Sequence, residues 1–399
     1  MKPSEIALCE LVESVEQCNP QKFEQAEFVY VDISSIDSEQ KVISQATYVP
    51  IEKAPSRARQ RLQTDDVLVS TVRPNLNGVA KVPSRLDGAI GSSGFCVLRT
   101  IPDKLDPDYL FFFCRHEFFI QSLVKEATGA SYPAVTNTDV LDVAIPWREI
   151  NEQREIARRL KKAERIWVIS QEMISQLDRL SESLFLEMFG DPERNPNNWD
   201  EYVIDDIAQK VTDGEHKTPM RTKSGVKLLS ARNIQNGYLD FEAGLDFISA
   251  REFERIKKRC FPEPGDVLMS CSGTIGRVTT VETSEPFGLV RSVALIKPDP
   301  KLVNARFLEH YLRSQYLQVL IRRSANQSSQ ANIFTSAIKE LPVLLPPIAL
   351  QEEFEKKLLA IVGMGVQLRE GLRQSELMLF GLLHASYDLG SATRTQVAV

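Results

Sequence analysis

The hydrophobic positions of this chain form two kinds of pattern, and each kind occurs twice. In the middle and near the end, apolar residues recur at alternating steps of four and three, which is the heptad pattern of a coiled-coil helix. The first run repeats at Ile156, Leu160, Ala163, Trp167, Ser170, Ile174, Leu177, Ser181, Leu184 and Met188. The second run repeats at Phe354, Leu358, Ile361, Gly365, Leu368, Leu372, Ser375, Leu379, Leu382 and Ser386. Charged pairs such as Arg158-Arg159, Lys161-Lys162 and Lys356-Lys357 lie between these positions, so we predict two different long helices that pack on each other, rather than two isolated core helices.

The segment before each long helix has a shorter period. Runs rich in β-branched residues alternate with turn sequences such as Asn236-Gly237 and Pro264-Gly265, which is typical of strands joined by tight connections. The clearest predicted strands are Phe28–Ile33, Val67–Val72, Lys227–Ser230, Val267–Ser270 and Val293–Lys297. An amphipathic helix is predicted late in each segment, at Asp108–Glu126 and Asn304–Arg323. Each segment is therefore predicted to be an α+β domain with loops gathered along one side.

The two halves of the chain are copies of one pattern, offset by about 198 residues. Asp65–Ser70 returns as Gly265–Ser270, and the start of the first long helix at Gln153 returns at Gln351. The expected parts are a first mixed domain at 1–148, a central long helix at 149–190, a second mixed domain at 191–347, a C-terminal long helix at 348–388 and a disordered tail at 389–399.

Composition limits the possible partners of the protein. The net charge of −6 disfavours nucleic acid, because duplex binding depends on Lys and Arg contacts to phosphate. A local groove can still be basic on an acidic protein, and partner subunits can supply positive surface. Nothing approaches the roughly 18 apolar residues of a membrane span, so no membrane association is expected. Six scattered cysteines without a CxxC pair indicate free thiols in a reducing compartment, the cytoplasm.

Motifs that carry chemistry are weak in this sequence. Asp191-Pro192 and Asn195-Pro196 resemble the N/D-P-P-aromatic motif of adenine methyltransferases, but the second proline is missing and Gly190 beside them indicates a helix stop. Gly273–Gly276 is too short for a phosphate loop and is better explained as a tight turn. The four histidines show no metal spacing. We therefore expect no catalytic residue and no metal site in this chain.

Polar and basic residues instead cluster on equivalent loops of the two domains. Arg can bind guanine with two N–H groups, Asn or Gln can bind adenine, and Ser, Thr and Lys can hold phosphates. The candidates for DNA binding in the first domain are Arg57, Arg73, Asn75, Ser92, Ser93, Ser131 and Tyr132. Those in the second are His216, Lys217, Thr218, Arg232, Asn233, Ser272, Thr274, Arg277, Gln327, Ser328 and Gln330. Any one of them alone is more often a solvated surface residue; their clustering favours double-stranded DNA as the ligand.

These segments resemble the specificity subunits of type I restriction–modification enzymes. Gly190-Asp191-Pro192 followed by Trp199 resembles the central region of that family. Asp213–Pro219 resembles its Asp-Gly-x-His-x-x-Pro opening, and Leu345-Pro346-Pro347 with Gln351 resembles its closing signature. The resemblance covers nearly the whole chain in the family's order, although the first domain lacks the Asp-Gly-x-His sequence.

The resemblance implies a non-catalytic subunit that recognises DNA. Two target recognition domains would be separated by two long antiparallel coiled-coil helices in a pseudo-twofold internal repeat. Each domain would read half of a bipartite asymmetric target, with half-site centres roughly 34 Å apart. The implied partners are two DNA methyltransferase (modification) subunits and motor–nuclease (restriction) subunits. S-adenosylmethionine, ATP and Mg are expected in those partners and no cofactor in this chain.

Three alternatives remain open from the sequence. The chain can be the specificity subunit of a type II enzyme whose partner fuses methyltransferase and nuclease. It can also be a scaffold in which the coiled coil is the functional part and the mixed domains bind protein; a salt-dependent gel shift with the methylating partner distinguishes this case. A self-contained methyltransferase is disfavoured because the chain has no room for a cofactor-binding half.

Overall fold

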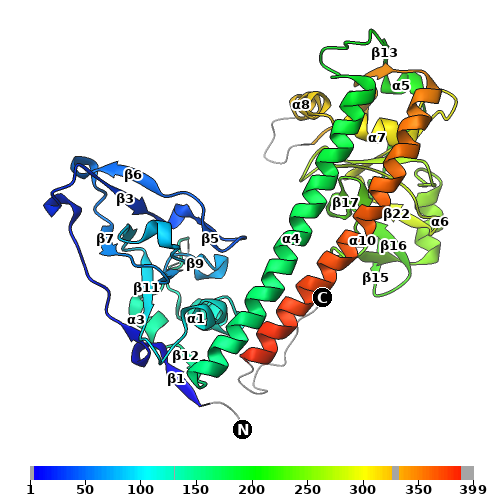
Figure 1. Cartoon of the computed structure of the whole chain (residues 1–399). Helices are drawn as coiled ribbons and strands as arrows, with labels where there is room; N and C mark the ends of the chain where they lie inside the picture. Colours follow the sequence, from blue (N-terminus) through cyan, green and yellow to red (C-terminus); the bar gives the residue numbers. More distant parts are fainter. Residues whose placement is uncertain (1–3, 130, 326–331, 388–399) are drawn as a thin grey trace. The chain divides into compact units, whose positions relative to one another are not determined.

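The computed structural model describes residues 4–129, 131–325 and 332–387 (Figure 1). The chain divides into two compact units, one formed by the chain up to Gln171 together with the part from Glu370 onward, the other by Glu172–Arg369. We call the strand-rich part of the first unit the first module (residues 4–149) and that of the second unit the second module (residues 190–347). Each unit also contains half of each long helix.

The long helices are α4 (Ile150–Phe189), of 40 residues, and α10 (Ile348–Ser386), of 39 residues. Every predicted seam position is buried or half-buried, which confirms the heptad register. In the second unit, the ring of Phe354 lies 5.7 Å from that of Phe185, near the end of α4. In the first unit, Leu160 from the start of α4 shares a core with Leu383 from the end of α10. The helices therefore pack antiparallel within each unit.

The first module contains two four-stranded sheets, ordered β2-β11-β8-β9 and β6-β3-β10-β7. Strands β3 and β10 pair in parallel and the other neighbours are antiparallel. A separate antiparallel pair, β1 (Glu5–Ala7) with β12 (Ala144–Pro146), joins the start of the module to its end. The sheet strands are β2 (Val12–Glu13), β3 (Glu27–Val31), β6 (Thr47–Pro50), β7 (Ala58–Arg61), β8 (Val67–Ser70), β9 (Val79–Lys81), β10 (Ile90–Ser92) and β11 (Phe95–Thr100).

The second module repeats this topology. Its sheets are ordered β14-β23-β20-β21 and β15-β19-β16-β22, with β16 and β22 in parallel, and β13 (Asp200–Val203) pairs with β24 (Pro342–Leu345). The sheet strands are β14 (Ala208–Asp213), β15 (Arg221–Thr222), β16 (Val226–Leu229), β19 (Asp246–Ile248), β20 (Val267–Ser270), β21 (Val278–Thr280), β22 (Phe287–Leu289) and β23 (Val293–Pro298). The modules differ at one sheet edge, where β7 pairs with β10 in the first and α6 (Ala250–Lys257) packs on β22 in the second.

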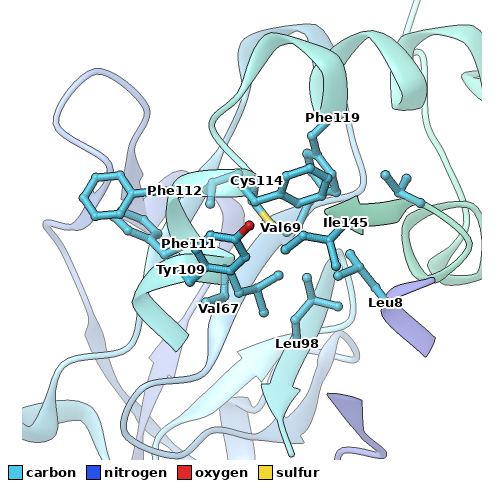
Figure 2. Close-up of a cluster of buried hydrophobic side chains, with 14 of the residues drawn as sticks. Leu8, Val67, Val69, Leu98, Tyr109, Phe111, Phe112, Cys114, Phe119 and Ile145 are labelled. Carbon is cyan, nitrogen blue, oxygen red and sulfur yellow. The ribbon is translucent and has the colours of Figure 1, made fainter. Parts of the chain in front are cut away.

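Helices after the last long strand of each module cover the first of its sheets. In the first module α1 (Pro107–Phe113) is buried over most of its length, and Tyr109 and Phe119 pack on Val67 and Leu98 of the sheet (Figure 2). The other helices described are α2 (Glu117–Glu126) and α3 (Asn137–Leu141), and in the second module α5 (Ile204–Ile207), α7 (Ala305–Arg313), α8 (Gln315–Ser324) and α9 (Thr335–Lys339).

The prediction of one amphipathic helix in each module is wrong, because each is broken into two. His116 and Ser314 adopt extended backbone at the breaks and cap the following helices. Nδ1 of His116 accepts the Phe118 N–H at 3.2 Å, and Oγ of Ser314 accepts the Leu317 N–H at 3.5 Å. Such caps satisfy N–H groups that the new helix leaves without partners. The apolar periodicity continues across both breaks, so periodicity alone does not reveal them.

The predicted helix stop at Gly190 and the predicted tight turn at Gly273–Gly276 are both confirmed. Helix α4 ends at Phe189, and Gly190 follows with φ of +80°, as the helix-stop interpretation requires. The indole N–H of Trp199 donates to the Phe189 carbonyl at 3.0 Å and fixes the chain beyond the helix. Gly273 has φ of +70° in a tight turn closed by the Gly276 N–H on the Ser270 carbonyl at 3.0 Å.

Candidate nucleic-acid interface

Main-chain hydrogen bonds join the loops at one end of the β8–β11 sheet in the first module. The Thr71 N–H donates to the Gly94 carbonyl at 3.0 Å, and the Val135 N–H donates to the Thr71 carbonyl at 2.9 Å. The Ser93 N–H donates to the Arg57 carbonyl at 2.7 Å. The loops at Thr71, at Gly94 and at Val135 are thus held at one edge of the sheet. The segment before β7, which contains Arg57, joins them there.

The second module joins its corresponding loops with two of the same three bonds. The Cys271 N–H donates to the Ser292 carbonyl at 2.8 Å, and the Ile333 N–H donates to the Cys271 carbonyl at 3.0 Å. The segment after β14 joins this edge through the Arg291 N–H, which donates to the Glu215 carbonyl at 3.1 Å. The clustering of candidate residues on equivalent loops, expected from the sequence, is therefore present in space.

Most predicted contact residues lie on the surface of these loops. In the first module Arg57, Arg73, Asn75, Ser93, Ser131 and Tyr132 are exposed. In the second module His216, Lys217, Thr218, Arg232 and Thr274 are exposed, and Ser272 and Arg277 are half-buried. Gln327, Ser328 and Gln330 lie outside the described residues.

Two predicted contact residues instead lie inside the protein. Asn233 is 1% exposed: its Oδ1 accepts the Ser230 N–H at 2.9 Å, and its Nδ2 donates to the carbonyls of Asp240 and Ala243. Ser92 is fully buried on β10, and its Oγ accepts the Gly94 N–H at 3.3 Å. Both side chains stabilise loops from within, so we remove them from the set of candidate DNA contacts.

Arg73 has an unusual backbone conformation for its residue type. Its φ is +51°, in the left-handed region, which costs a residue with a Cβ about 1–2 kcal/mol. Its guanidinium carbon lies 4.6 Å from the centre of the Tyr132 ring. The two loops are joined at this point, since the Arg73 N–H donates to the Pro133 carbonyl at 2.7 Å.

The basic residues of the second module are largely engaged with carboxylates. Arg259 contacts Asp213 at 2.5 Å, and His216 contacts the other oxygen of Asp213 at 2.7 Å. Arg221 and Arg232 both pair with Asp246, at 2.8 and 2.9 Å. These pairs orient the side chains on the loops and also neutralise part of their charge.

Arg291 is a candidate contact that sequence reasoning missed. It is exposed in the turn between β22 and β23, at the position that Ser93 occupies between β10 and β11. Among the described residues it forms no ion pair, so its charge faces solvent at the joined loops. The repeat offset applied to Ser93 leads to Arg291 and would have found it.

The described residues include no group of three or more His, Cys, Asp or Glu side chains that could hold a metal ion. In the part of the chain that the structure describes, no helix is both long and apolar enough to cross a membrane. All six cysteines are free thiols, as predicted.

Residues 196–374 match the family model of the type I restriction modification DNA specificity domain. The family model, the curated relatives and the solved structures together indicate a type I restriction–modification specificity subunit. Two similar curated subunits are those of EcoBI from Escherichia coli, 26% identical over 165 residues, and the putative MjaX enzyme from Methanocaldococcus jannaschii, 22% identical over 351 residues. The EcoBI match covers 41% of this chain and only 34% of that subunit, whereas the MjaX match covers 82% and 79%.

Solved structures share the fold of this chain. The type I S subunit from M. genitalium superposes with a TM-score of 0.57 at 13% identity, covering 97% of this chain and 99% of that one. A chain from a study of complex assembly in a type I R-M system gives a TM-score of 0.53 at 23% identity, covering 96% and 97%. The type I names do not favour the type II and scaffold alternatives.

Proposed function

We propose that this specificity subunit reads a bipartite, asymmetric DNA target, with one half-site contacted by each module. The observation that carries the proposal is the pair of joined loop edges: the hydrogen bonds of Thr71 and Cys271 correspond, but the side chains that the loops present differ. Equal scaffolds with different side chains suit the recognition of two different base sequences, since base edges carry the sequence information in DNA.

We also propose that the chain itself is non-catalytic and assembles in the cytoplasm with two modification subunits and with restriction subunits. Those partners would bind S-adenosylmethionine, ATP and Mg, and the modification subunits would flip an adenine out of the duplex and methylate it. Charge supports this division of labour, because a chain with a net charge of −6 gains from the positive surface of partners on DNA.

Mapping of methylated adenines across the host genome tests the proposal. We expect two short motifs at a fixed separation, and both should disappear when this chain is deleted. Exchange of residues 1–145 with those of a relative should change one motif and leave the other intact. A single continuous motif, or a change in both motifs after the exchange, would contradict the modular assignment.

A gel shift with the modification partner present separates DNA recognition from a scaffold role. Affinity for target DNA should fall steeply as salt rises, because phosphate contacts release counterions. Binding that is insensitive to salt and to DNA sequence would favour a protein scaffold.

A further inference from the structure

Arg73 occupies a backbone position at which the second module has glycine. It follows β8 as Gly273 follows β20, and the φ values are 51° and 70°. In both modules the preceding residue forms a β-bridge to the loop before the next helix, Val72 to Ala134 and Ser272 to Asn332. Glycine adopts this conformation without steric cost, whereas arginine does not. Folding of the turn therefore does not explain an arginine at position 73.

The surroundings of Arg73 hold its side chain in one orientation. Its guanidinium stacks on the ring of Tyr132, which is itself 69% exposed. The bond from the Arg73 N–H to the Pro133 carbonyl fixes the backbone beside that ring. Among the described residues no carboxylate pairs with Arg73, unlike Arg232 and Arg259 in the second module. A stacked guanidinium keeps the N–H donors at its planar edge available for a ligand.

We propose that Arg73 recognises a guanine in the half-site of the first module, with Tyr132 orienting its guanidinium. Two parallel N–H groups match O6 and N7 of guanine in the major groove, whereas adenine places an amino donor at the first of these positions. Orientation before binding reduces the conformational freedom lost in the complex. This inference rests on the proposed function, because it assigns one base contact within a DNA target.

The test uses the full chain with its modification partner and duplexes that carry the methylation-mapped target. Each guanine of the first half-site is replaced in turn by 7-deazaguanine, which lacks N7, or by inosine, which keeps O6 and N7 but lacks the minor-groove amino group. For one guanine, 7-deazaguanine removes one of the two acceptors and should weaken wild-type binding by about 3-fold to 10-fold, part of the worth of a bidentate contact. Inosine at the same position should change binding little.

Arg73→Gly is the decisive variant, because glycine suits the φ of this turn and the module should remain folded. Its binding to unmodified target should fall by about 10-fold to 100-fold, the general worth of a bidentate contact, and 7-deazaguanine should cause no further loss. Arg73→Lys should not restore binding, since an ammonium lacks the planar pair of donors. Methylation mapping in cells with Arg73→Gly should show that one guanine is no longer required.

Four results would overturn the inference: a first half-site without guanine, additive losses from variant and base analogue, sensitivity to inosine instead of 7-deazaguanine, or full rescue by lysine. Full rescue would indicate a phosphate contact. All four leave the bipartite motif in place, so they are distinguishable from failure of the proposed function, in which no bipartite motif depends on this chain.

Discussion

The two modules place an arginine at the same point of the fold but surround it with different chemistry. Arg115 follows α1 and lies 5.0 and 5.2 Å from the ring centres of Phe111 and Phe112. Arg313, its counterpart in α7, instead pairs at 3.1 Å with Glu309, which is fully buried. Arg115 also pairs with Glu164 of α4, so both arginines are ion-paired, but Phe111 of the first module stands where the second has the buried Glu309.

The buried carboxylate of Glu309 has a partner on each side. Glu309 accepts hydrogen bonds from the Thr280 N–H at 2.9 Å and the Thr280 hydroxyl at 2.8 Å, and it also pairs with Arg306 at 2.9 Å. Burial alone would raise the pKa of Glu309, but the guanidinium groups of Arg306 and Arg313 and the hydrogen bond from Thr280 hold it below its ordinary value. The two modules therefore share their backbone geometry, but a buried position can be apolar in one module and charged in the other.

Removal of the Glu309 side chain should lower the stability of the second unit more than any other change predicted here. Glu309→Ala leaves the buried Arg306 guanidinium without its main partner and should destabilise the second unit by about 3–5 kcal/mol. Urea unfolding of the full chain, with hydrogen exchange at α7, measures the loss. Glu282→Ala is the matched control: that side chain also pairs with Arg306 but is 57% exposed, so it should cost less than about 1 kcal/mol. Similar losses for both variants would show that the buried network is not a unit.

The next largest effect is a pH dependence of stability that arises from His310 in the second module and has no counterpart in the first. Burial lowers the pKa of His310 to about 4, and the equivalent residue of α1 is Phe112. Because the unfolded chain takes up the proton first as pH falls, this contribution to stability is present above pH 6.5 and is lost between 6.5 and about 4, by about 3 kcal/mol.

His310→Phe, which copies the first module, should flatten that part of the curve. The free energy of unfolding of wild type and variant is compared at pH values from 7.5 to 4.5, so that the difference between them isolates His310. Two curves that stay parallel over this range would disprove the buried neutral histidine.

A third prediction concerns what the modules have in common. Gln153 and Gln351 are both fully buried near the starts of the long helices. Gln153 accepts the Asp106 N–H at 2.9 Å and donates to the Lys104 and Arg148 carbonyls. Gln351 makes the equivalent contacts, accepting the Asn304 N–H at 2.8 Å and donating to the carbonyls of Leu302 and Pro346.

Substitution of either glutamine by alanine leaves these buried main-chain groups without hydrogen-bond partners. The free energy of unfolding of the affected unit should fall by about 2 kcal/mol. Urea unfolding compares the two variants with Gln374→Ala, whose exposed amide donates to Glu370 and whose loss should cost less than about 0.5 kcal/mol. Unequal losses for Gln153→Ala and Gln351→Ala would mean that the shared scaffold is not equally important in the two units.

Residues that obey a period were predictable, and residues whose partners are distant in sequence were not. The heptad positions and the strand Val267–Ser270 follow from apolar spacing, which records burial directly. Asn233 was mistaken for a surface contact because a polar residue that caps a loop from inside has the same local sequence as one that faces solvent. Arg232 pairs with Asp246 because the intervening hairpin brings the two together. The pair therefore cannot be predicted from the local sequence around either residue.

The smallest expected effect lies at the loop edge, where Arg291 in the second module replaces Ser93 of the first. Arg291→Ser should weaken binding to the full target by about 1 kcal/mol and reduce the slope of log K against log salt by about one, as expected when one phosphate contact is lost. Sequence preference should not change, since phosphate carries no base information. Lys301→Ala is the matched control: this exposed lysine lies beyond the other end of β23, and its loss should leave the salt slope unaltered. A relaxed base preference in Arg291→Ser would instead make Arg291 a base-reading residue, and the two modules would then read DNA from different loops of the same scaffold.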